Sequence, residues 1–337
     1  MHEEEIGNYV FEKLNKLGFK TTKDKIGNVI GFLDGIGETL LLESHLDRVP
    51  PGKANVPIID KGVIKTDGSS NLGADDAAGV AIILEAVSEI IKNKITHPPL
   101  LVVFTVQEEI GLRGARALDL SQYNIKYGIA YDNAGLVETI ITKASSYIGF
   151  DVEIIGKSVH PGKNLKQSIN VFNIINEIDW QIGESKDKKT RINLGKIDIG
   201  VARNVTPGIG KINGEIRSFL NEKELKNLIK KLKNNISKIC KKYKAKFKFT
   251  TDRHAFSYSV NKNEILFKKY KRICKNRFKT GSTFIASDTS VFRGEKKLKV
   301  FTISTGVENE HTVNESIKIK DLTLLEKDLV SLIKSLN

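Results

Sequence analysis

The feature that most restricts the fold is an apolar run that ends in two adjacent glutamates. Residues 99–109 read "PLLVVFTVQEE", a continuous apolar stretch typical of a strand buried on both faces in a parallel sheet. Such sheets are covered by helices, so the run indicates an α/β architecture. Glu108 and Glu109 stand where this strand is predicted to end, and two neighbouring carboxylates are costly to bury without a partner. The pair therefore indicates a chemical function.

The segments on either side of this run continue an alternating α/β pattern. Helices are predicted over residues 3–17, 74–94, 261–277 and 320–336, and strands over residues 39–47, 127–135 and 299–304. The helix at 74–94 begins with acidic residues in its first turn, which suits the helix dipole. Together these segments predict a mixed-sheet α/β domain.

A different pattern interrupts this domain. Strands are predicted at 147–155, 191–199, 209–219 and 244–251, and helices at 163–183 and 221–242. The resulting β-α-β-β-α-β order is typical of a ferredoxin-like α+β sandwich. A chain of 337 residues also exceeds the usual size of a single core. We predict an α/β domain formed by residues 1–145 and 253–337, with a ferredoxin-like domain inserted at 146–252.

The net charge of +14 raises the question of a nucleic-acid partner. Lysines are concentrated at 221–249 and 268–279. In the first of these segments apolar residues recur at helical spacing, so its lysines form the solvated face of a helix. Nucleic-acid binding is therefore not expected, although a non-catalytic basic binding protein remains a remote alternative.

Membrane insertion and a disulfide framework are not expected either. No apolar run approaches the length that spans a bilayer, and the first residues are acidic and amphipathic rather than signal-like. The two cysteines, Cys240 and Cys274, have no CxxC spacing. We therefore expect a cytoplasmic protein.

Acidic and histidine residues recur where the predicted strands and turns end. They are His45 and Asp47 at the end of the strand 39–47, Asp75 and Asp76 where a turn enters the helix at 74–94, Glu108 and Glu109 at the end of 99–109, Asp132 at the end of 127–135, and His311 after the last strand. Ligands of open α/β sheets bind beyond the carboxyl ends of the strands, where these side chains are predicted to gather. The sequence therefore predicts one polar site at this edge.

Carboxylate oxygens and imidazole nitrogens are suitable ligands for zinc, manganese or cobalt. Two divalent cations about 3.5–4 Å apart would relieve the repulsion among so many carboxylates. One of the two adjacent glutamates can then bind metal while the other accepts a proton from water. Asp47 is placed to orient His45 through the second ring nitrogen of that histidine.

Several motifs, in order, resemble the co-catalytic dizinc exopeptidases of the peptidase T, aminoacylase and carboxypeptidase G group. They are "SHLDRVP", "LGADDAAGVA", "TVQEEIGLRGA", "YDNAG" and "EHTVNE", with "GKSVHPG" (156–162) and "NVTPGIGKINGEIRSF" (204–219) in the predicted insert. The resemblance covers nearly the whole chain. It implies two divalent ions, with zinc as the expected metal and cobalt or manganese as alternatives. It also implies an inserted lid domain through which a homodimer forms, and a cis peptide bond between Asp75 and Asp76.

The resemblance also implies a role for each matching residue. His45 and Asp132 would bind one metal, Glu109 and His311 the other, and Asp75 would bridge the two. Glu108 would be the general base acting on a metal-bridged water, and Asp47 would support His45. In the insert, His160 would bind substrate or the oxyanion, and Arg217 would hold a substrate carboxylate.

The expected reaction is inferred from one ligand position and one motif. Asp132 and "TVQEEIGLRGA" resemble the peptidase T-like aminopeptidases, which favours release of N-terminal residues from short peptides; a deacylase or carboxypeptidase on the same scaffold is the alternative. The sequence departs from the family pattern at Ala77, where many members have lysine. It departs again at "FIASDTSVF" (284–292), which leaves the roles of Ser287 and Asp288 open.

Overall fold

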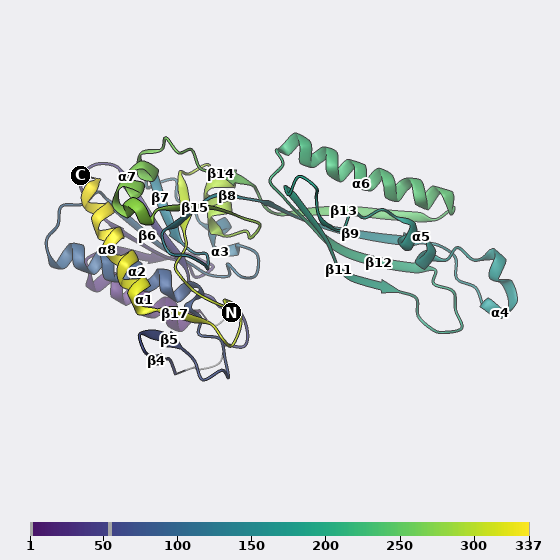
Figure 1. Cartoon of the computed structure of the whole chain (residues 1–337), viewed down its shortest axis with the longest axis horizontal. Coiled ribbons are helices and arrows are strands. Elements are labelled where there is room, and N and C mark those ends of the chain that lie inside the picture. Colours follow the sequence, from purple (N-terminus) through teal and green to yellow (C-terminus); the bar gives the residue numbers. More distant parts are fainter. Residues whose placement is uncertain (1–2, 53–55, 337) are drawn as a thin grey trace. The chain divides into compact units, whose positions relative to one another are not determined.

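The computed structural model describes residues 3–52 and 56–336, which divide into two compact units (Figure 1). The first unit comprises the chain up to Lys143, Tyr258–Thr283 and the chain from Ser287 onward. The second comprises Ala144–Ser257 and Phe284–Ala286. The chain therefore leaves the first unit, builds the second and returns.

The first unit is organised around one mixed sheet. Within the described residues it has nine strands in the order β1-β2-β6-β3-β7-β16-β8-β14, with β15 paired to β8. They are β1 (Lys20–Lys23), β2 (Val29–Leu33), β3 (Thr39–His45), β6 (Leu100–Thr105), β7 (Ile125–Tyr131), β8 (Thr139–Ala144), β14 (Tyr258–Ser259), β15 (Lys279–Thr283) and β16 (Val300–Ile303). β6, β3, β7 and β16 are parallel neighbours, so their carboxyl ends lie along one edge.

Helices cover this sheet. They are α1 (Glu4–Lys16), α2 (Ala74–Lys92), α3 (Arg113–Ala117), α7 (Ile265–Cys274) and α8 (Ile319–Ser335), with a 3₁₀ turn at Lys275–Arg277 and a π-helical turn at Ser290–Glu295. Every residue of β3 and β6 is buried, because these central strands have neighbours on both sides and covered faces. α2 packs against β3 and α8. Gly79 permits the close approach of α2 to the end of β7, since a Cβ there would lie 2.5 Å from the carbonyl oxygen of Tyr131.

A small antiparallel sheet lies beside the start of α8. Its strands are β4 (Ile58–Asp60), β5 (Val63–Lys65) and β17 (Ser316–Lys318), in the order β17-β5-β4. β17 pairs with β5, which anchors the chain immediately after the loop that carries His311. None of the helices in the described part of the chain combines the length and apolar character needed to cross a membrane.

The second unit has the ferredoxin-like order predicted from the sequence. Its antiparallel sheet runs β10-β11-β12-β9-β13, from β9 (Ser146–Ile155), β10 (Gly183–Glu184), β11 (Thr190–Ile199), β12 (Ile209–Ser218) and β13 (Lys246–Ala255). Its helices are α4 (Pro161–Asn164), α5 (Val171–Glu177) and α6 (Glu222–Lys242), with a 3₁₀ turn at Leu165–Gln167. Apolar residues of α5, α6 and the sheet share one core. The predicted fold class, a mixed-sheet α/β domain with an α+β insert, is confirmed.

Some element boundaries differ from the prediction. β6 ends at Thr105 rather than residue 109, because the chain turns away through Gln107, whose φ is 59°. The helix predicted at 163–183 is reduced to α5, since Asn170 caps its start and Ile178 is already extended. The second unit extends to Ser257 rather than 252, because β13 stays paired with β9 through Ala255.

Candidate metal centre

Six of the predicted site residues lie at one edge of the main sheet. His45 is the last residue of β3, and Asp132 follows β7 directly. Asp75 is in the first turn of α2, Glu108 and Glu109 are in the loop after β6, and His311 is in the loop between β16 and β17. The parallel strands bring these loops together, as the sequence predicts.

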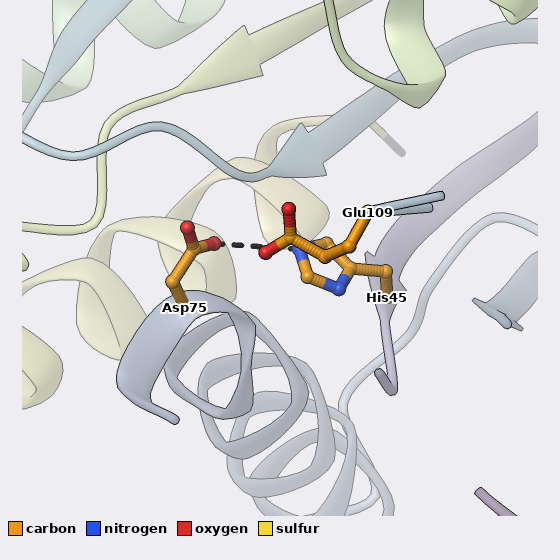
Figure 2. Close-up of side chains that lie close together, drawn as sticks. All are labelled: His45, Asp75 and Glu109. Atoms are coloured by element: carbon orange, nitrogen blue, oxygen red, sulfur yellow. Dashed lines mark hydrogen bonds and ion pairs between the residues drawn. The ribbon is translucent and has the colours of Figure 1, made fainter. Parts of the chain in front are cut away.

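Asp75 connects the two histidines. Its Oδ1 lies 3.3 Å from His45 Nε2, and its Oδ2 lies 3.1 Å from His311 Nε2. His311 Nε2 is also 2.8 Å from Glu109 Oε1. Figure 2 shows His45, Asp75 and Glu109 converging from β3, α2 and the loop after β6, and their ligand atoms all lie within 4.8 Å of one another. The Asp75–Asp76 peptide bond is cis, as predicted.

Asp75 and His311 shift each other's pKa values. Burial alone would raise the pKa of Asp75, but the hydrogen bonds with His311 and His45 hold it well below its usual range. The hydrogen bond to Asp75 is the main cause that raises the pKa of His311, to about 9. Asp75 is therefore an ionised carboxylate that directs one oxygen to each imidazole, an arrangement suited to bridging two cations.

Asp47 holds the adjacent glutamates. The backbone N–H of Glu108 donates to Asp47 Oδ1 at 2.9 Å, and that of Glu109 donates to Oδ2 at 3.1 Å. The Asp47 side chain also lies 3.5 Å from His45 Nδ1, while the shorter contact of that nitrogen, 3.0 Å, is with the Asp47 carbonyl oxygen. Asp47 thus supports the glutamate loop as well as His45, a role that the sequence analysis missed.

Glu108 and Asp132 are carboxyl groups whose proton affinity is increased. Glu108 is buried, and its burial raises its pKa well above the usual value. Burial, and then the charge of Asp75, raises the pKa of Asp132 to about 7. A buried carboxyl of this kind can hold and release a proton near neutral pH. Glu108 has the environment of a general base, and Asp132 is close enough to Asp75 to respond to its charge.

Two further groups of buried residues support the site and were not assigned from the sequence. Asp76 accepts a hydrogen bond from the Ser44 hydroxyl at 2.5 Å and another from Gly79 N at 3.1 Å, which fixes the start of α2 against β3. The Thr105 hydroxyl donates to Asp288 Oδ2 at 2.6 Å and lies 3.2 Å from Glu43 Oε1. Asp288 is 1% exposed, so it faces the interior. The proximity of Asp288 to Glu43 and Thr105 was not evident from the sequence.

His160 and Arg217 belong to the second unit. His160 is exposed and caps α4, because its Nδ1 accepts a hydrogen bond from Gly162 N at 3.1 Å. The Arg217 guanidinium lies 4.2 Å from the centre of the Tyr147 ring and donates to the Phe284 carbonyl at 2.9 Å. Since the two units are described separately, the roles of His160 and Arg217 toward the metal centre stay predictions.

A second compact group of potential ligands lies elsewhere in the first unit. It consists of Glu138, Cys274 and Asp328, all buried. The Arg277 guanidinium forms ion pairs with both carboxylates, with Glu138 and, at 3.3 Å, with Asp328. This group already contains a cation and is best understood as an ion pair network that joins α7, α8 and the start of β8.

The donors of the first group fit divalent cations. Glu109 Oε1 is buried and accepts no hydrogen bond of good geometry, although His311 Nε2 lies 2.8 Å away. Asp75 and Glu109 pair with imidazoles, which are neutral when they bind metal. The side chains of Asp75 and Glu109 are partly buried and form ion pairs with imidazoles, and oxygen and imidazole donors of this kind suit zinc and similar ions.

Comparison with known proteins identifies the family. Residues 41–335 match the model of peptidase family M20/M25/M40. The uncharacterized protein YqjE of Bacillus subtilis is 29% identical over 349 residues, covering 99% of this chain and 93% of that protein. Matches to proteins named peptidase T are shorter and span about a third of those proteins, 31% in one case.

Two solved structures have nearly the same fold. The aminopeptidase PepT from Bacillus cereus has a TM-score of 0.92 and 27% identity, covering 99% of this chain and 93% of that one. A tripeptidase from Staphylococcus aureus has the same TM-score and identity, covering 98% and 92%. The chain therefore belongs to peptidase family M20/M25/M40, as a peptidase T-like metallopeptidase.

Proposed function

We propose that the protein is an exopeptidase that releases N-terminal residues from short peptides with two divalent metal ions. The observation that carries this proposal is the Asp75 carboxylate, which faces His45 with one oxygen and His311 with the other, beside the buried Glu108. The two solved structures of the same fold are named an aminopeptidase and a tripeptidase, which supports a short peptide as substrate.

The proposed ligands are those that the family resemblance implies, and the contacts of Asp75 with both histidines support them. Asp75 would bridge the two ions, His45 and Asp132 would hold one, and Glu109 and His311 would hold the other. When bound, divalent ions would polarise the scissile carbonyl and lower the pKa of an attacking water. Zinc is the proposed metal, and cobalt and manganese suit the same donors.

Glu108 performs the proton transfers in this proposal. Its carboxylate accepts the proton of the attacking water as the C–O bond forms. It then donates that proton to the leaving amine nitrogen as the C–N bond breaks, so the same group serves as base and then acid. Asp47 keeps the Glu108 backbone in place through the hydrogen bond of 2.9 Å.

The second unit is proposed to act as a lid. His160 would donate to the developing oxyanion, and Arg217 would bind a substrate carboxylate. His160→Ala should keep the metals while kcat falls by roughly 10²–10³, the size expected for one oxyanion donor. His254→Ala, a change at another histidine of the same unit, serves as the control. Unchanged kcat in the His160 variant would remove this residue from the mechanism.

The remaining expectations concern partners and location. We propose a homodimer formed through the second unit, and a cytoplasmic location, for which Cys240 and Cys274, both free thiols in the structure, give some support. Nucleic acid is not proposed as a partner, since the lysines of α6 lie on the exposed face of an amphipathic helix.

A substrate panel tests the proposed reaction. Purified protein is stripped of metal, reloaded with zinc, cobalt or manganese, and assayed by mass spectrometry with a free tripeptide, its N-acetylated form, and N-acetylated amino acids. We expect the free N-terminal residue to be released from the tripeptide in a metal-dependent reaction. Faster hydrolysis of the acetylated amino acids would instead identify a deacylase, and release of the C-terminal residue a carboxypeptidase.

A further inference from the structure

Glu315 is a buried carboxylate beside the proposed metal centre to which no role has been assigned. It lies in the loop between β16 and β17, four residues after His311, and is 1% exposed. Its Oε2 accepts a hydrogen bond from Gly73 N at 2.7 Å, and its Oε1 accepts one from Asp75 N at 2.9 Å. Both oxygens are thus bound to the backbone that leads into α2, more than two hundred residues away in the sequence.

The loop that carries Glu315 is closed at its base. Glu308 N donates to Ser316 O at 2.9 Å, and Ser316 N donates to Glu308 O at 3.0 Å. Within the loop, the Thr312 hydroxyl donates to Asn309 O at 2.8 Å, and Glu315 N donates to Thr312 O at 3.2 Å. These bonds hold the backbone of His311 and that of Glu315 in a fixed relation.

A capping function alone explains this residue poorly. A neutral serine or asparagine accepts a hydrogen bond at a helix start without adding charge. Glu315 instead places a carboxylate close to Asp75, which is itself negative, although the helix dipole offsets part of the cost. Its two oxygens fix both ends of the Gly73–Asp75 segment, which a single acceptor atom could not do.

We propose that Glu315 is a positioning residue of the metal centre, a role that rests on the proposed metal-dependent function. It acts through Asp75, whose backbone it holds, and through the loop that presents His311. By linking these two segments, it sets the separation between the bridging carboxylate and the imidazole 3.1 Å from it. Such support of ligands by their hydrogen-bond partners typically changes metal affinity.

Metal affinity measured directly tests this proposal without relying on activity. Metal-free wild type, Glu315→Gln and the control Glu308→Gln are titrated with zinc against a chromogenic chelator. Glu308 lies on the same loop, but is exposed and paired with Lys318. Glu315→Gln keeps the shape of the side chain, removes its charge and turns an NH₂ group toward one backbone N–H. We expect about 10–100-fold weaker zinc binding for Glu315→Gln and no change for Glu308→Gln.

Equal zinc affinity of Glu315→Gln and wild type would overturn the positioning role, even if the variant were less stable. If that variant does not fold, Glu315→Asp, with its shorter carboxylate, must bind zinc more weakly than wild type for the proposal to stand. Failure of wild type itself to bind zinc would overturn the metal centre as a whole.

Discussion

Within the described residues, the first unit contains two groups of potential metal ligands, one buried and one partly buried, that differ in their source of positive charge. In the group of Glu138, Cys274 and Asp328, the Arg277 guanidinium pairs with both carboxylates. In the group of His45, Asp75 and Glu109, the acidic side chains face imidazoles instead. An arginine is permanently charged, whereas an imidazole loses its proton when it binds metal. In the first arrangement the chain itself supplies a permanent positive charge, whereas in the second the imidazoles give up their protons when metal ions bind, and the ions then supply the positive charge.

This difference has a functional meaning. The Arg277 guanidinium already pairs with both carboxylates of its group, so these carboxylates do not need a metal ion to offset their charge. Carboxylates that depend on exchangeable cations can instead bind metal ions that retain open coordination positions. The comparison predicts that changes in the two groups will separate metal binding and catalysis from stability.

The largest effect is expected from loss of the bridging carboxylate. Asp75→Ala removes the group that faces both His45 and His311, so both metals should be lost and peptide hydrolysis should fall below detection. Metal content is measured by mass spectrometry after desalting. Asp328→Ala, at the other acidic group, should keep wild-type metal content. Two metals retained by Asp75→Ala would show that the ligand assignment is wrong.

The next effect separates metal binding from proton transfer within one site. Glu108→Gln preserves the shape of the side chain and removes its proton acceptor, so kcat should fall by about 10²–10⁴-fold. Metal content should remain at the wild-type level, because Glu108 is not a proposed ligand. Steady-state kinetics on a tripeptide measure this change. Near-normal turnover would leave the adjacent glutamates without an explanation.

The sequence predicts which side chains gather at the site better than the contacts that hold them. His45, Asp132 and Glu109 could be placed there because each lies at or after the end of an apolar strand, and local patterns reveal strand ends. The contact of Asp47 with the backbone of Glu108 and Glu109 spans more than sixty residues, and that of Glu315 with Asp75 spans 240. Such distant pairs depend on the folded sheet, and periodicity in one sequence contains no signal for them.

In the fold too, local elements could be predicted from the sequence, whereas contacts between distant residues could not. The strands β3 and β7 were predicted because buried central strands are continuously apolar. β6 was predicted to continue to residue 109, since "VQEE" follows without a turn residue, yet its pairing with β3 ends at Thr105. The Glu138–Asp328–Arg277 network was missed, because none of its members lies in a motif or at a regular spacing.

A smaller effect is expected when the cation of the second group is removed. Arg277→Met leaves Glu138 and Asp328 buried without their partner, which should destabilise the protein by about 2–3 kcal/mol. This is less than for a fully buried pair, since the Arg277 side chain is 42% exposed. Calorimetry of the metal-free protein measures the change, and zinc affinity should stay at the wild-type value. A loss of zinc affinity equal to that of Asp75→Ala would mean that the two groups are not independent.

The smallest effect concerns the pH dependence of zinc binding. In the metal-free protein the hydrogen bond to Asp75 raises the pKa of His311 to about 9, so near neutral pH this imidazole carries a proton that must leave before metal binds. Acidification below that pKa favours the protonated form and opposes binding. Asp132, whose pKa is raised to about 7, must also be deprotonated to bind metal, so zinc affinity should fall by at least about tenfold per pH unit between about pH 8 and pH 6. Burial, together with the nearby Asp328, also raises the pKa of Glu138 to about 7, but this residue lies in the group that already has its cation. Glu138→Gln should consequently leave the slope of zinc affinity against pH unchanged, whereas His311→Ala should both weaken binding and reduce that slope. Zinc affinity independent of pH in wild type would argue that His311 is not a ligand.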